Sequence, residues 1–279
     1  MGQAAVKERV AWFGDEENLV AIVSDPPVRR SGPDLLILNA GVLHRVGPHR
    51  LHVNLARALA GLGHRVTRLD LSGIGDSRAL PGRMTFRESS VADIRSTLDS
   101  LTAEGGSSDF ILFGICSGAD NALAAAGADP RIRGLVLVDP PAYATARSQT
   151  RQSLGGASGM QAWVRLLLRF GRSALRRLAR VFKKPSSAKA HTGGRETPPI
   201  EEYRRQLNAL VARNVRILAI YSGVLGARFN HEDQLFETFP ELRGKMQSAF
   251  FPNANHTFTE LSAQADLQAL VVRWCESWH

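Results

Sequence analysis

Short, unbroken runs of apolar residues alternate with longer segments of helical character along the first half of the chain. The apolar runs cover residues 35–38, 110–113 and 135–138, and the helical segments cover 48–62, 91–101 and 117–128. Unbroken apolar runs are typical of strands that are covered on both faces, as in a parallel sheet with crossover helices. The pattern therefore predicts an α/β fold with a mostly parallel central sheet and helices on both faces.

The two ends of the chain extend this prediction. Two short runs, 9–13 and 19–23, flank a polar turn and predict an N-terminal hairpin. Segment 65–70 reads as one more strand of the first half. Beyond residue 200 the alternation returns, with helices expected over 200–211, 231–239 and 259–278 and strands over 215–221 and 248–251. The order of these elements matches one large α/β domain.

Residues 141–199 interrupt the alternation and predict a helical lid inserted between two parts of a core domain, 1–140 and 200–279. The lid is expected to contain a flexible, polar part over 185–199. Its helical part is basic and amphipathic, since a series of arginines spaced by three and four residues shares one face. The arginines proposed as substrate or lid contacts are Arg165, Arg169, Arg172 and Arg176.

Composition narrows the functional classes. The chain has 279 residues, 44% hydrophobic and 22% charged, which is ordinary for a globular protein. Its net charge of +9 is concentrated in segment 163–184, which holds eight basic and no acidic residues. The basic helix is either a solvated lid helix that packs its apolar stripe against the domain, or a surface for an acidic carrier protein, an anionic membrane or a thioester substrate that bears phosphate. No motif supports nucleic-acid binding, and no cofactor or metal is expected.

The two cysteines, Cys116 and Cys275, cannot form a disulfide framework, and neither a signal peptide nor a spanning segment is evident. A cytoplasmic protein with free thiols is therefore expected. Cys275, near the end of the last predicted helix, reads as a packing residue. Cys116 has a more specific setting.

Cys116 occupies the centre of the sequence Gly-Ile-Cys-Ser-Gly at 114–118, between an apolar strand and an alanine-rich helix. This is the setting of the G-x-S-x-G nucleophile elbow, with cysteine in the serine position. Side chains at the two glycine positions would collide with the neighbouring strand and helix. The helix N-terminus favours a thiolate, so Cys116 is the predicted nucleophile. Ser117 is a weaker rival, since it lacks the glycine frame.

His256 is the predicted base, because it lies in the loop after the last apolar strand and before the last helix. A histidine in that place, late in the chain, matches the order nucleophile, acid, histidine. The other histidines that we considered, His44, His49, His52, His64 and His231, are expected on the surface, with the first four also considered as substrate contacts.

These features resemble the α/β-hydrolase superfamily across essentially the whole chain. Segments 39–48 and 70–77 resemble in particular a group of bacterial hydrolases found beside exosortase and polysaccharide-export genes. Segment 70–77 is similar to the D-x-x-G-x-G-x-S loop that is common after the fourth strand of that fold. The resemblance implies an oxyanion hole made by the N–H of Ser117 and by that of Gly41 or Ala40.

The resemblance also implies a carboxylate after the strand that ends at Tyr221, but Gly226 stands in the expected position. Two aspartates could replace it. Asp139 follows the preceding strand, where some relatives place their acid, and Asp233 begins the next helix. Both stay open from the sequence, and a cysteine–histidine pair can also work with a weak third member.

The leading hypothesis is thus an acyl-transfer enzyme, either a hydrolase or an acyltransferase, that acts on an ester or thioester. Cys116 would form the acyl-enzyme and His256 would act as general base. The alternative is a non-catalytic protein of the same fold that docks an acidic partner through the basic lid. The missing carboxylate at Gly226 supports that alternative.

Overall fold

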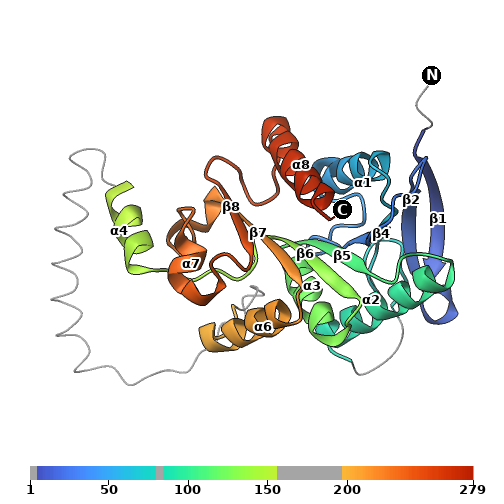
Figure 1. The fold of residues 1–279 in the computed structure, drawn as a ribbon, viewed down its shortest axis with the longest axis horizontal. Coiled ribbons are helices and arrows are strands. Elements are labelled where there is room, and N and C mark those ends of the chain that lie inside the picture. Colours follow the sequence, from blue (N-terminus) through green and yellow to red (C-terminus); the bar gives the residue numbers. More distant parts are fainter. Residues whose placement is uncertain (1–4, 80–83, 156–196, 279) are drawn as a thin grey trace.

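The computed structural model describes residues 5–79, 84–155 and 197–278 (Figure 1). At its centre is an eight-stranded sheet in the order β1-β2-β4-β3-β5-β6-β7-β8. The hairpin pair β1–β2 and the pair β2–β4 are antiparallel, and the remaining pairs are parallel. The strands are β1 (Lys7–Phe13), β2 (Leu19–Asp25), β3 (Asp34–Ile37), β4 (Val66–Leu69), β5 (Phe110–Ile115), β6 (Ile132–Val138), β7 (Arg216–Ser222) and β8 (Gln247–Phe251).

Helices cover both faces of this sheet, with α1 and α8 on one face and α2, α3 and α6 on the other (Figure 1). The α-helices are α1 (Leu51–Gly61), α2 (Phe86–Ala103), α3 (Ser117–Ala128), α4 (Ala146–Gly155), α6 (Ile200–Ala212), α7 (Gln234–Thr238) and α8 (Leu261–Glu276). Short 3₁₀ helices are η1 (Asp15–Glu17), η2 (Pro48–Arg50), η3 (Gly223–Arg228) and η4 (Pro240–Leu242). The predicted α/β class, with a mostly parallel sheet, is confirmed.

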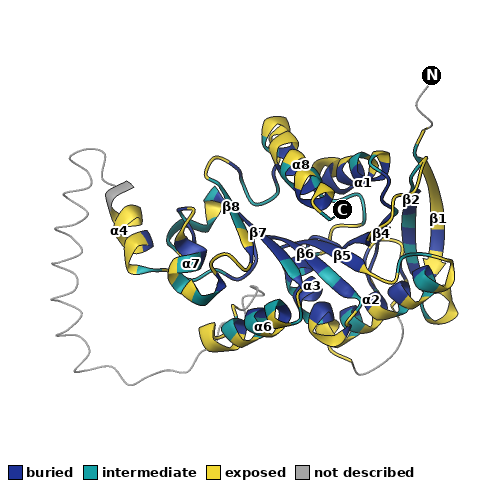
Figure 2. Ribbon diagram, in the orientation of Figure 1, coloured by how far each residue is buried: buried dark blue, intermediate teal, exposed yellow. Residues whose placement is uncertain are grey.

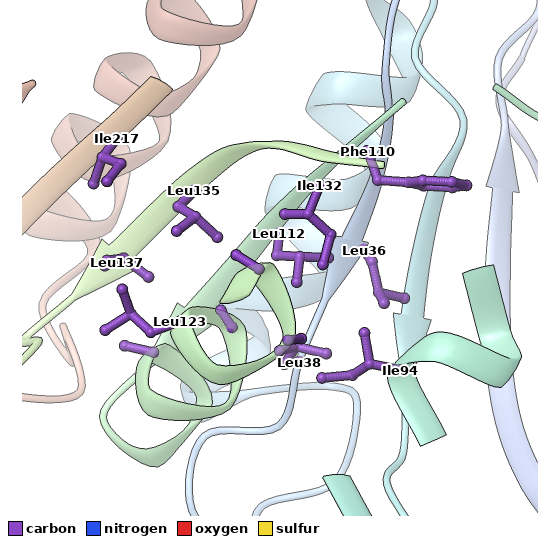
Figure 3. Packing of buried hydrophobic residues seen from close by; sticks show 14 of the residues in the cluster. Leu36, Leu38, Ile94, Phe110, Leu112, Leu123, Ile132, Leu135, Leu137 and Ile217 are labelled. Atoms are coloured by element: carbon purple, nitrogen blue, oxygen red, sulfur yellow. The ribbon is translucent and has the colours of Figure 1, made fainter. Parts of the chain in front are cut away.

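Each side of the sheet has its own hydrophobic core. Leu36 and Leu38 point to the side of α2 and α3, where they pack in one cluster with Ile94 (Figure 3). Leu35 and Ile37 belong to the cluster on the opposite face, with α1 and α8. Successive side chains of a strand point to opposite faces, so a strand buried on both sides must be apolar at every position. Figure 2 shows the buried sheet between helices with exposed outer faces.

The predicted elements recur with small shifts at their ends, and helix α3 has the predicted bounds. The helix expected over 231–239 is shorter, because α7 covers only Gln234–Thr238. The Gln234 side chain accepts a hydrogen bond from the Asn230 N–H at 2.8 Å, which supports a turn before the helix. Pro240 disfavours helical backbone at the residue before it, which ends α7.

The first residues of the predicted lid pack on the core domain. Ser148, on α4, donates a hydrogen bond to the carbonyl of Ala227 at 2.7 Å, and Thr145 donates to Glu237 at 2.9 Å. The basic helix with Arg165, Arg169, Arg172 and Arg176 lies outside the described residues, so the division into core and lid stays a prediction. Within 5–79, 84–155 and 197–278, no helix is long and apolar enough to cross a membrane.

Candidate active site

Cys116 lies in the turn between β5 and α3 with φ 57° and ψ −118°, a conformation that non-glycine residues rarely adopt. The two glycines of the motif make this turn sterically feasible. A Cβ on Gly114 would lie 2.2 Å from the carbonyl of Gly118, and one on Gly118 would lie 2.4 Å from the carbonyl of Asn39. The predicted collisions are therefore real, and the turn has the geometry of a nucleophile elbow.

His256 reaches Cys116 from the loop between β8 and α8, and the two side chains are hydrogen-bonded. Asn255 keeps this loop in place, because its side chain accepts hydrogen bonds from the N–H groups of Thr257 at 3.2 Å and Thr259 at 3.1 Å. The His256 side chain keeps 38% of its surface exposed. The imidazole is thus both fixed in position and open to a substrate.

Asp139 contacts the other side of the imidazole. Its Oδ2 atom lies 2.5 Å from Nδ1 of His256, and the carboxylate is fully buried. Ser222, at the end of β7, donates two further hydrogen bonds to this carboxylate, from its N–H to Oδ1 and from its hydroxyl to Oδ2, each at 2.7 Å. Together these donors compensate for the burial of the charge. The sequence did not single out Ser222, because a serine at a strand end has no pattern of its own.

The rival carboxylate, Asp233, lies elsewhere. It is exposed and forms an ion pair with Arg243 at 3.3 Å. Gly226, at the position where a carboxylate was missing, has φ 58°, in the left-handed region that favours glycine. The structure therefore brings Asp139, and not Asp233, to His256.

The hydrogen bonds that His256 forms with Asp139 and then with Cys116 raise its pKa to about 9, against the opposing effect of burial. An imidazole with this pKa is protonated at neutral pH. Cys116 is half-buried and lies next to this positive charge, whereas Cys275 is fully buried. Burial raises the pKa of the Cys275 thiol to about 12, so that thiol is expected to be inert.

Two backbone N–H groups converge on the elbow. Ser117 is the first residue of α3, where backbone N–H groups have no partner within the helix. The N–H of Gly41, in the loop after β3, donates to the Ser117 hydroxyl at 3.1 Å. Gly41 and Ser117, both predicted for the oxyanion hole, are thus brought together. The open choice between Gly41 and Ala40 favours Gly41, because its N–H faces the elbow.

A buried polar network holds the loop that carries Gly41. The Asn39 side chain donates to Asp70 at 2.9 Å and accepts from the N–H of Leu71 at 2.8 Å. Arg45 forms an ion pair with the fully buried Asp70 and a second one with Asp76. These contacts join segments 39–48 and 70–77 and hold the loop that carries Gly41 in place.

Several histidines differ from their predicted surface positions. His52 and His64 are buried beside the sheet, and His231 is 4% exposed and 3.3 Å from Glu237. His52 lies on α1 among buried apolar neighbours, whereas His64 and His231 lie in loops, so helical spacing explains the burial of His52 alone. His44 and His49 are exposed as predicted.

A cavity of about 410 Å³ adjoins the elbow. It lies between α2, α3, α6 and the segment after β6, and Ser117 is part of its wall. Elsewhere in the described ranges, no group of three or more histidine, cysteine or acidic side chains is placed to hold a metal ion.

Comparisons with known proteins agree with this fold. The family model described as "Serine aminopeptidase, S33" matches residues 41–233, more than half of the chain. No curated protein matches the chain.

Solved structures with similar folds include an α/β serine hydrolase without lid from Xanthomonas campestris, with 17% identity and a TM-score of 0.53 over 99% of this chain and 98% of that one. An esterase from Pyrococcus furiosus has 14% identity and a TM-score of 0.59, over 98% and 92% of the two chains. A proline iminopeptidase from Mycobacterium smegmatis has 18% identity and a TM-score of 0.56, over 97% and 98%.

At these identities the structural likeness shows the fold alone, and the narrower resemblance to exosortase-associated hydrolases stays a prediction. The family match extends from the oxyanion loop through the elbow and Asp139. The chain belongs to the serine aminopeptidase S33 family of α/β hydrolases, with a cysteine at the centre of its nucleophile elbow.

Proposed function

We propose that the protein is an acyl-transfer enzyme that acts on an ester or thioester through an acyl-enzyme on Cys116. One observation carries the proposal. The thiol at the elbow, the imidazole of His256 and the carboxylate of Asp139 form one continuous hydrogen-bonded row. This is the arrangement of nucleophile, base and orienting acid that activates a nucleophile in acyl transfer.

A cysteine nucleophile is compatible with a protonated His256. With a pKa of about 9, His256 carries a proton at neutral pH, and an imidazolium next to a thiol stabilises the thiolate. A serine hydroxyl would instead need a neutral imidazole as its base at the moment of attack. We therefore propose that His256 acts as the base before the substrate arrives, by taking the proton of Cys116.

The reaction follows from these positions. The Cys116 thiolate attacks the carbonyl carbon, a C–S bond forms, and the bond to the leaving group breaks as His256 donates its proton to that group. The neutral His256 then removes a proton from water or another acceptor, which attacks the thioester and releases Cys116 as thiolate. The proton left on His256 restores the initial pair. Water gives hydrolysis, and an alcohol or amine gives transfer.

The negative charge on the carbonyl oxygen is assigned to the N–H groups of Gly41 and Ser117. In the ligand-free site the Ser117 hydroxyl accepts the Gly41 N–H, so the substrate oxygen has to replace one hydrogen bond. Removing one such donor typically lowers kcat about 10²- to 10³-fold.

The alternative of a non-catalytic binding protein rested on the absent carboxylate at Gly226. Asp139 contacts His256 directly, and this contact favours the catalytic function over that alternative. An acidic carrier or an anionic membrane surface as the partner of the basic segment stays a prediction, as does the cytoplasmic location.

Incubation with an acyl thioester followed by intact-mass analysis tests the proposal. We expect one acyl adduct on the wild type and on Cys275→Ala, and none on Cys116→Ala. Prior treatment with iodoacetamide should block the adduct, because Cys275 is fully buried and only Cys116 is accessible. An undiminished rate of thioester cleavage by Cys116→Ala would overturn the proposal.

A further inference from the structure

Asn121, on α3, is a largely enclosed polar residue one helical turn from the elbow. It is only 5% exposed, and it forms part of the wall of the 410 Å³ cavity. Its amide atoms are not fully enclosed by the described residues, so they are accessible from the cavity. Polar atoms at the wall of a cavity ordinarily bind water or a ligand.

The place of Asn121 relative to the elbow follows from helix geometry. Ser117 and Asn121 are four residues apart on α3 and therefore lie on one face of the helix, about 6 Å apart along its axis. Both line the cavity, although neither Cys116 nor His256 does. The cavity thus begins beside the oxyanion loop and extends one helical turn away from the reacting atoms, as expected for a subsite of the acyl group.

The chemistry of the wall indicates what the subsite recognises. Apolar side chains such as Leu123 and Tyr203 line it, and hydrogen-bond acceptors lie among them, including the carboxylates of Asp120 and Glu202. Burial, followed by the charges of Glu202 and Asp120, raises the pKa of the nearby Tyr143 to about 12. Arg87 is the basic residue of the described wall. The two carboxylates are complementary to a group that donates hydrogen bonds.

We propose that this cavity is the acyl-binding subsite, and that Asn121 selects acyl groups that carry a hydroxyl or amino substituent over plain alkyl chains. The assignment rests on the proposed acyl transfer at Cys116. A chain methylene would pack against Leu123 and Tyr203, while the substituent donates a hydrogen bond to the Asn121 carbonyl oxygen. An alkyl chain of the same length would displace water from the amide without replacing its hydrogen bond, which is the basis of discrimination at polar sites.

The N-acetylcysteamine thioesters of hexanoic, ω-hydroxyhexanoic and ω-aminohexanoic acid provide the test. For the wild type, kcat/KM should be about three- to tenfold higher for one or both substituted thioesters than for the hexanoyl thioester. In Asn121→Leu, which replaces the amide by an apolar group of similar size, this ratio should fall to about one or below. The matched control is Asn54→Leu, on the exposed face of α1, which should keep the wild-type ratio.

Binding to Cys116→Ala, measured by calorimetry, separates this inference from the proposed function. Tighter binding of a substituted thioester, lost in Cys116→Ala/Asn121→Leu, supports the subsite even if no acyl adduct forms, and such a result would remove only the proposed chemistry. Equal binding of the three thioesters, or no binding at all, would overturn the subsite whether or not Cys116 is acylated. Comparison of the hydroxyl and amino compounds shows which donor is preferred.

Discussion

The Nδ1 atom of His256 lies 2.5 Å from the Oδ2 atom of Asp139, a carboxylate at the end of β6. Asp139 has φ 48°, and its backbone N–H donates to the carbonyl of Ile220 on the neighbouring strand β7 at 2.7 Å. The carboxylate is therefore fixed both by its own unusual backbone and by β7. An acid that follows β6 therefore contacts His256, in place of the acid after β7 that the resemblance implied.

Replacement of Asp139 by asparagine should lower kcat by at least about tenfold, because an amide removes the charge that holds His256 in its protonated form. The pKa of His256 should fall from about 9 toward its ordinary value. The pH profile of alkylation by iodoacetamide measures this shift directly, since less imidazolium leaves the thiolate less stable.

The matched control is Asp233→Asn, which changes the exposed aspartate that was the other candidate from the sequence. It should keep the wild-type pH profile. Since Asp139 is fully buried, the melting temperature of each variant has to be measured alongside. A folded Asp139→Asn protein with unchanged alkylation and turnover would contradict the assignment of Asp139.

Ser222 is expected to act as a positioning residue for Asp139. Ser222→Ala removes the hydroxyl that donates to Oδ2 of Asp139, a hydrogen bond to a charged group that contributes about 1.5–3 kcal/mol. We expect a lower kcat with KM nearly unchanged, and recovery in Ser222→Thr, which keeps the donor. A purely structural role would lower the melting temperature of Ser222→Ala while leaving kcat of the folded protein unaltered.

The fold was predictable because its signals are local and repeated. Each buried strand of the parallel part needs apolar residues on both faces, and residues 35–38 show that requirement without interruption. The bounds of α3 were also accessible, since the elbow fixes its start. The start of α7 was harder to predict, because a side-chain contact of Gln234 favours a turn before it and the apolar pattern does not show this contact.

The site was only partly predictable, for a different reason. Cys116 and His256 each have a recognisable local setting, but their contact with Asp139 depends on how three separate loops converge. Sequence alone left Asp139 and Asp233 open, since each follows a strand or begins a helix in the right part of the chain. Ser222 and Asn121 gave no signal, because what distinguishes them is burial next to a charge or a cavity.

The glycines of the elbow give a sharp test of the backbone geometry. Gly118→Ala places a Cβ only 2.4 Å from the carbonyl oxygen of Asn39 and should destabilise the protein by about 1–3 kcal/mol. Gly127→Ala, on the same helix, meets no atom within 4 Å and should stabilise the helix by about 0.5–1 kcal/mol. Urea denaturation of both variants checks the opposite signs. Equal effects would show that close approach of the backbones at Gly118 is not limiting.

His52 should make the protein less stable in mild acid. The side chain is fully buried, with its ring edge-on to Phe113 at 5.8 Å, and no described residue pairs with either ring nitrogen. Burial, and to a lesser degree the charge of Arg68, lowers its pKa to about 3. In the unfolded chain a histidine titrates near its ordinary value of about 6.5. The unfolded state therefore binds the proton first as the pH falls.

The direction of the pH dependence follows from this difference between the pKa values of His52 in the folded and unfolded states. The contribution of neutral His52 to the free energy of unfolding is fully present above about pH 6.5. It falls by up to about 1.4 kcal/mol per pH unit as the pH decreases toward 3. His256, with its raised pKa, is protonated in both states below about pH 6 and adds no slope there. Urea midpoints between pH 7 and pH 5 should thus fall in the wild type and in the control His49→Asn, at an exposed position. His52→Leu should fall less over this range, because it has no buried imidazole to keep neutral; an equal decline in His52→Leu would assign the acid sensitivity to other groups.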